Sequence, residues 1–85
     1  MSHTTPILWA GLTPRERVLI DGPRIIAITS AIRGSPPWER PAVAAMEANE
    51  LVAFGCRSAV AVETCNAIRR RVEGMERGPQ DLYRG

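Results

Sequence analysis

Two glutamates on one predicted helix come closest in this sequence to a pair of catalytic groups. Glu47 and Glu50 are three residues apart, so a helix places them about one turn apart on the same side. Paired carboxylates hold metal ions or transfer protons when histidine or further acids accompany them. The single histidine is His3, and the sequence contains no glycine-rich phosphate loop and no serine elbow. We therefore expect a solvent-facing helix surface here, with no enzyme activity, no cofactor and no metal site.

The two cysteines are the other candidates for reactive groups. Cys56 and Cys65 are nine residues apart, which on one helix separates them by ~13 Å, whereas a disulfide needs Cα atoms within ~7 Å. Two cysteines and one histidine are also too few for a typical four-ligand zinc site. The N-terminus lacks the charged and apolar regions of a signal peptide, and no stretch has the ~20 apolar residues of a membrane helix. These features predict reduced thiols and a cytoplasmic location.

All 11 basic residues are Arg, against nine acidic residues and a net charge of +2. A set without Lys is typical of a GC-rich bacterial or phage genome, and Arg also makes bidentate contacts to carboxylates and phosphates. The only basic run is Arg69-Arg70-Arg71. On a helix these side chains spread over ~200°, which favours a solvated face over a phosphate-binding patch. Residues 35–55 contain one Arg and three Glu, so they form the acidic part of the chain.

Trp, Tyr and Arg are the residue types that dominate protein interfaces. Trp38 lies in the proline-rich connector 35–41, where stiff backbone reduces the entropy lost on docking. Its indole either reaches a partner or covers the domain's own core. We expect a partner protein to contact the aromatic residues of the two ends and the connector, together with arginines of the last helix: Trp9, Trp38, Tyr83, Arg69, Arg70, Arg71 and Arg77.

Local capping signals divide the chain into the elements that position these residues. Thr13-Pro14-Arg15-Glu16 is a capping box with Pro at the first helical position. The segment after Pro23 contains four Ile, which suit a strand, but no second strand candidate exists to pair with it, so a helix is favoured. The predicted helices are about 14–21, 23–33, 41–54 and 58–77, within one helical domain 13–78 that has an arm 1–12 and a tail 79–85.

The first two helices suggest an alternative function. The stretch Leu12–Arg17 resembles the opening of the helix-turn-helix domain of LuxR-type regulators, but the longer first helix of that family is interrupted here by 21–23. A generic helix-turn-helix would read DNA with polar side chains of its second helix: Arg24, Thr29, Ser30 and Arg33. The alternative is therefore a small DNA-binding regulator.

The third and last helices carry the clearest apolar patterns. In the third helix, one side is expected to hold Val43, Met46, Leu51, Ala53 and Phe54, and the other Glu47, Asn49 and Glu50. The last helix has an apolar seam with the spacing 4, 3, 4, 3, typical of helix pairing: Ala61, Cys65, Ile68, Val72 and Met75. Since 11 residues are Ala, the core of one chain should be thin, and we expect this seam to join two copies as a homodimer.

Taken together, these patterns predict an all-α fold, a small bundle of three to four short helices. The expected function is a non-enzymatic protein–protein interaction module, such as a bacterial or phage-encoded regulator, adaptor or inhibitor. Nucleic acid is the less favoured partner, and no membrane binding is expected.

Overall fold

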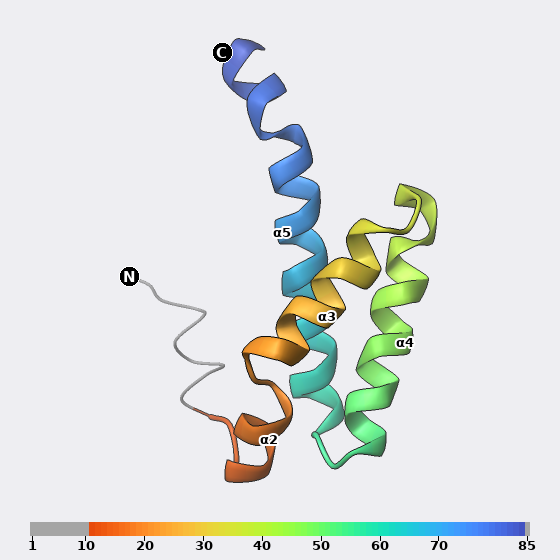
Figure 1. Cartoon of the computed structure of the whole chain (residues 1–85), viewed down its shortest axis with the longest axis vertical. Coiled ribbons are helices and arrows are strands. Elements are labelled where there is room, and N and C mark those ends of the chain that lie inside the picture. The colour runs from red at the N-terminus through yellow and green to blue at the C-terminus, as the bar shows by residue number, and fades with distance from the viewer. Residues whose placement is uncertain (1–10, 85) are drawn as a thin grey trace.

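The computed structural model describes the backbone of residues 11–84 and the side chains of residues 11–76. Within this part the chain forms only helices, in the order α2 (Pro14–Leu19), α3 (Gly22–Arg33), the 3₁₀ turn η1 (Pro37–Glu39), α4 (Arg40–Ala53) and α5 (Ser58–Arg84) (Figure 1). The all-α prediction is confirmed, and so is the helical interpretation of 24–33. Trp9 and most of the predicted arm lie outside the described residues.

The capping box predicted at Thr13 opens α2. The Thr13 hydroxyl accepts a hydrogen bond from the Glu16 amide at 3.2 Å, and the Glu16 carboxylate accepts one from the Thr13 amide at 2.9 Å. The helix ends at Leu19, two residues earlier than predicted. The reason is that Asp21 caps the next helix by accepting from the Arg24 amide at 2.9 Å, so the chain must leave α2 before it.

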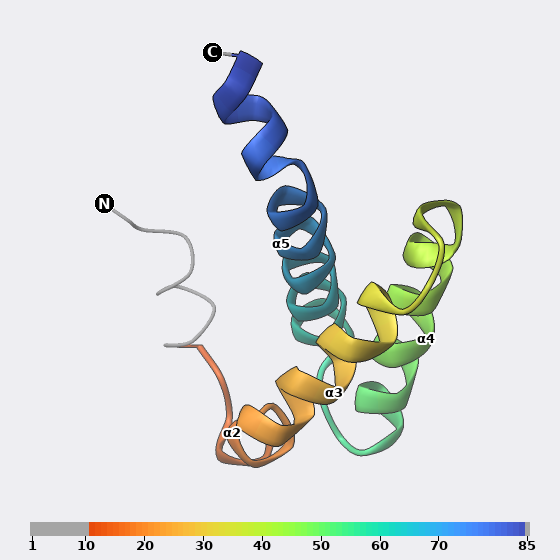
Figure 2. The same cartoon turned by 45° about the horizontal axis from the view of Figure 1, so that its top comes forward.

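Helices α4 and α5 run antiparallel, and α3 lies across them (Figures 1 and 2). The neighbouring helices α4 and α5 bury small residues in the common core: Ala44, Ala48 and Ala61. Small side chains allow two helix axes to approach closely. The larger core residues are Ile28 and Ile32 of α3, Leu51 of α4 and Val72 of α5, each fully buried.

A tight connection, residues 54–57, joins α4 to α5. Gly55 has φ +116°, a left-handed conformation that favours glycine. The Gly55 amide donates to Val52 O at 3.0 Å and the Cys56 amide to Leu51 O at 2.9 Å, the two bonds of a Schellman motif. The predicted helix end at Gly55 is therefore confirmed.

Helix α5 is longer than predicted. It continues through Gly78 and Pro79 to Arg84, so the predicted helix end at residue 77 is wrong. Proline inside a helix removes one backbone hydrogen bond and bends the axis, but it does not force the backbone to leave the helical region. The final turns extend past the rest of the bundle (Figure 1). Among the described helices, none has both the length and the apolar composition needed to cross a bilayer.

Candidate docking surface

An arginine at the start of α4 holds the connector that carries Trp38. Arg40 is buried, and its Nε donates to Ile32 O at 3.1 Å and to Ser35 O at 3.2 Å. Its two Nη atoms donate to the Glu76 carboxylate at 2.7 and 2.8 Å. This bidentate hydrogen bond raises the pKa of Arg40 and lowers that of Glu76. One guanidinium therefore fixes the end of α3, the connector and the middle of α5 relative to one another.

A second ion pair fastens α2 to the α4–α5 connection. Glu16 is fully buried and accepts from Arg57 Nε at 2.8 Å, Arg57 Nη2 at 2.8 Å and the Arg57 amide at 2.9 Å. Arg57 also donates to Gly11 O at 2.6 Å. The hydrogen bonds from Arg57 and Thr13 hold the pKa of Glu16 well below its usual range. Both oxygens of the Glu16 carboxylate thus accept hydrogen bonds that hold α2 to the α4–α5 connection.

Trp38 is not part of the core. Its exposed fraction is 78 %, the largest among the exposed apolar side chains of the described residues. It lies in η1 between Pro37 and Glu39, and Arg40 anchors the backbone directly after it. The alternative prediction, in which this indole covers the domain's own core, is wrong. The stiff connector holds a large apolar side chain in water.

The outward side of α4 follows η1 in the chain and is also exposed. The core side of α4 is formed by Arg40, Ala44, Ala48 and Leu51. At ~100° per residue, the exposed positions on the opposite side fall within ~120° of helix surface. We call these α4 residues, together with Trp38 of the turn η1 before them, the outer face of α4: Trp38, Ala42, Ala45, Met46, Asn49, Val52 and Ala53. None of these residues is charged, and Met46 and Val52 are 65 % and 41 % exposed.

This finding corrects the predicted division of the third helix. Met46 and Ala53 do not share the core side with Leu51, and Asn49 lies among the apolar residues of the outer face rather than with the glutamates. Glu47 is half-buried, and burial, followed by the neighbouring Glu50 carboxylate, raises its pKa. Apolar residues thus occupy two sides of α4, and only one of these sides is covered by the chain itself.

The apolar seam of α5 lies in the core of a single chain. Ala61, Cys65, Ile68 and Val72 are all buried, while Met75 is 52 % exposed. These four residues belong to the same cluster as the core residues of α3 and α4. Their assignment to self-association is therefore corrected: the helices that cover the seam are those of the same chain. Met75 alone remains exposed.

Of the predicted arginine contacts, the structure describes the side chains of Arg69, Arg70 and Arg71. Arg69 is half-buried and donates to Glu73 at 3.3 Å. Arg70 and Arg71 are exposed, and Arg70 lies ~180° from the buried Ala61 around α5, on the side away from α4. Arg77 and Tyr83 lie on α5, but their side chains are outside the described part, as is all of Trp9.

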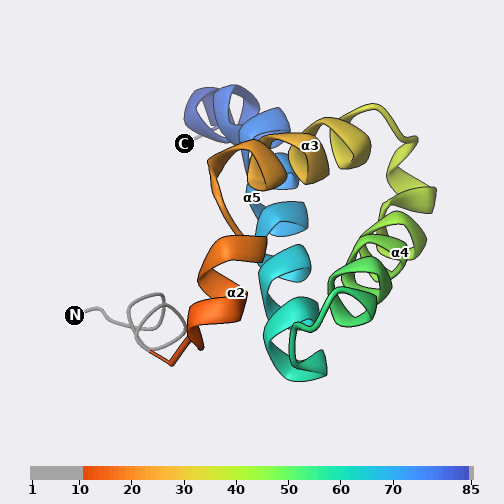
Figure 3. The ribbon, with the colours of Figure 1, turned by 60° about the horizontal axis from the view of Figure 1, so that its bottom comes forward.

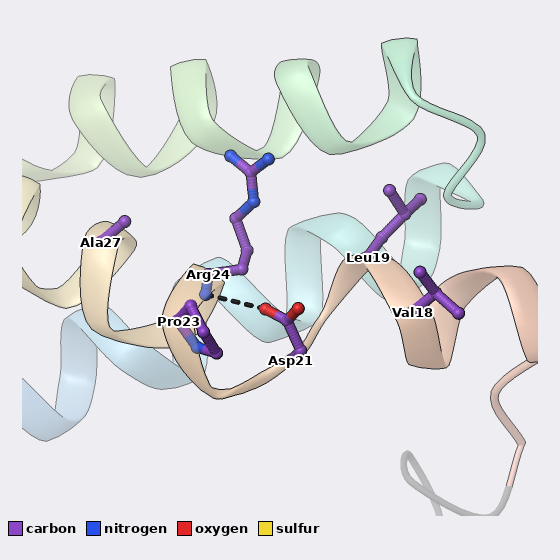
Figure 4. Close-up of a pocket in the computed structure, with 6 residues that line it drawn as sticks. All are labelled: Val18, Leu19, Asp21, Pro23, Arg24 and Ala27. Atoms are coloured by element: carbon purple, nitrogen blue, oxygen red, sulfur yellow. Dashed lines mark hydrogen bonds between the residues drawn. The ribbon is translucent and has the colours of Figure 1, made fainter.

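Of the four polar residues expected to read DNA, Arg24 points away from the others. The Arg24 guanidinium lies 5.6 Å from the centre of the Phe54 ring, toward α4 (Figure 4). The Thr29 hydroxyl donates to Ile25 O at 2.7 Å, within its own helix. Only Ser30 and Arg33 of the four are exposed. Because Arg24 lies about 180° from Arg33 around α3, the four side chains do not form the single DNA-reading surface that was predicted.

An open depression of ≈ 320 Å³ lies beside α2 and α3. Figure 4 shows its lining, Val18, Leu19, Asp21, Pro23, Arg24 and Ala27. Asp21 is engaged as a helix cap, and Arg24 is directed toward α4. No unused polar group is therefore aimed at a ligand in this depression.

The cysteines offer no reactive site. Both are free and buried, and Cys56 lies in the connection 54–57 rather than on the helix that carries Cys65. Burial raises the pKa of the Cys65 thiol to about 11. No group of three His, Cys, Asp or Glu residues in the described part of the chain could hold a metal ion.

Comparisons of this chain with protein families, curated proteins and solved structures give no match. The fold class is a small all-α bundle, and its most distinctive surface is the outer face of α4.

Proposed function

We propose that this protein is a non-enzymatic interaction module that binds another protein through the outer face of α4, with Trp38 as the anchor. The observation that carries the proposal is the helix with two apolar sides. The side of a surface helix that faces water normally carries charged and polar residues. Here α3 and α5 cover one side of α4, and Met46 and Val52 remain exposed on the other, after the exposed Trp38 of η1.

The position of Trp38 strengthens this proposal. Rigid aromatic anchors dominate binding because they bury a large area with little loss of side-chain entropy. The prolines before Trp38 and the Arg40 hydrogen bonds after it fix the backbone before any partner arrives. The exposed positions of α5 include the apolar Val62 and Met75, but the charged Glu63, Arg70 and Arg71 stand among them.

A matched pair of variants tests the proposal. Met46 and Ile26 are 65 % and 67 % exposed, but Met46 lies on the outer face of α4 and Ile26 on α3. The proteins captured by the tagged chain in its native host should be lost with Trp38→Ala and Met46→Glu and kept with Ile26→Glu. If Ile26→Glu removes the captured proteins and Met46→Glu does not, the outer face of α4 is not the docking surface.

We place this interaction in the cytoplasm, because two free, buried thiols suit a reducing compartment. A homodimer is the simplest alternative occupant of the outer face, and light scattering of the purified chain measures it directly.

A further inference from the structure

We infer that the occupant of the outer face of α4 is a helix of a different protein that carries basic side chains along one edge. This inference rests on the proposed docking function and adds the chemistry of the partner. It is based on the shape of the face, on the position of two unpaired acidic residues, and on what these residues do to the pairing of two copies.

The shape of the outer face suits one helix. The α4 positions of the outer face, residues 42 to 53, form a stripe about 16 Å long, and Trp38 lies in the turn η1 before it. Large side chains stand at Trp38, Met46 and Val52, and the smaller Ala42, Ala45 and Asn49 lie between them. Such an alternation of ridges and gaps accepts the aliphatic side chains of a second helix.

Two acidic residues lie beside the stripe, Glu39 in the turn before α4 and Glu50 on α4, and Arg24 of α3 reaches the far end of that side, over the Phe54 ring. Glu39 and Glu50 are both exposed and eleven residues apart, which is about 16 Å at the rise of a helix. Neither forms an ion pair with any residue that the structure describes, whereas Glu16, Glu73 and Glu76 each pair with an Arg. The opposite edge begins with Pro41 and is uncharged. A docked helix would therefore meet negative charge along one side only.

The same acidic edge disfavours a second copy of this chain. When two α4 helices pair antiparallel about a two-fold axis, the equivalent edges of both helices lie on the same side of the pair. Glu39 of one copy would then face Glu50 of the other, and like charges placed side by side oppose association. A helix with Arg or Lys at two positions three turns apart would convert both contacts into attraction.

A displayed library of single-helix peptides, with randomised face and edge residues, tests this partner chemistry on the full-length protein. Selected peptides should carry Arg or Lys at two edge positions three turns apart. The double variant Glu39→Arg, Glu50→Arg should bind them about tenfold more weakly, and peptides with Glu at those positions should regain binding to this variant. Glu63→Arg is the control, because Glu63 is exposed on α5 and should leave binding unchanged.

The outcomes separate the partner chemistry from the docking site. Peptides that need Trp38 and Met46 but bind equally to the Glu39→Arg, Glu50→Arg variant overturn the basic partner and keep the docking function. Peptides whose binding is unchanged by Trp38→Ala and Met46→Glu overturn both the basic partner and the docking function. A library that yields no binder also overturns both. A dimer mass in light scattering that falls to a monomer mass with Met46→Glu assigns the face to a second copy and overturns the inference.

Discussion

Replacing Trp38 with Ala should leave the stability of the fold nearly unchanged. The side chain is 78 % exposed, so about one fifth of an area of ~250 Å² is covered by the rest of the chain. At ~25 cal/mol per Å², that coverage corresponds to at most about 1.4 kcal/mol of unfolding free energy. Ile28→Ala provides the contrast, because Ile28 is fully buried and its truncation should cost about 2–5 kcal/mol.

Urea unfolding followed by far-ultraviolet circular dichroism measures both free energies without relying on tryptophan fluorescence. The slope of the transition should stay the same in Trp38→Ala, since the surface exposed on unfolding hardly changes. The fluorescence that the parent has and the variant lacks comes from Trp38. It should have the emission of a water-exposed indole, and acrylamide should quench it readily. A loss of stability in Trp38→Ala as large as that in Ile28→Ala would place the indole in the core and refute the assignment of the outer face.

Three further predictions concern the groups that hold or line the core. Thr13→Ala should lower the unfolding free energy by about 0.5–2 kcal/mol, because it removes the capping hydroxyl. Thr13→Ser keeps that hydroxyl and should lower the unfolding free energy less. Equal urea midpoints for the parent and the Ala variant would contradict the cap. Because the pKa of Glu16 is held below its usual value of about 4.3, its contribution to stability is complete above that pH and is lost as the pH falls. Glu16→Gln should therefore be less stable near pH 7 and show a shallower acid decline, and a parallel decline of both urea midpoints would count against this ion pair. The Cys65 thiol, with a pKa raised to about 11, should react slowly with a thiol reagent in the folded protein and quickly in urea; fast labelling of the folded chain would show that it is accessible.

The helix boundaries that could be predicted from the sequence are those fixed by local chemistry. Thr13 and Glu16 close a capping box within one turn, and Gly55 supplies a left-handed residue where α4 ends. The boundary near Pro79 was wrong, because a single proline disfavours a helix without excluding it. Local signals thus identify where helices start more reliably than where a long helix stops.

The contacts between distant residues could not be predicted in the same way. Arg40 and Glu76 are 36 residues apart, and Glu16 and Arg57 are 41 apart, and nothing in either local sequence selects that partner. The seam on α5 was recognised as apolar, but an apolar stripe does not reveal whether the same chain or a second chain covers it. The outer face of α4 was missed because its alanines were weak signals and Met46 was assigned to the core side.

The short connection between α4 and α5 has a consequence for the order of folding. Leu51 and Ala61 both belong to the same buried cluster yet are only ten residues apart, so packing α4 against α5 closes a small loop at little entropic cost. We expect the α4–α5 hairpin to form in the transition state and α2 to dock afterwards. Leu51→Ala should then mainly slow folding, whereas Ile20→Val, a change in a buried residue just after α2, should mainly accelerate unfolding.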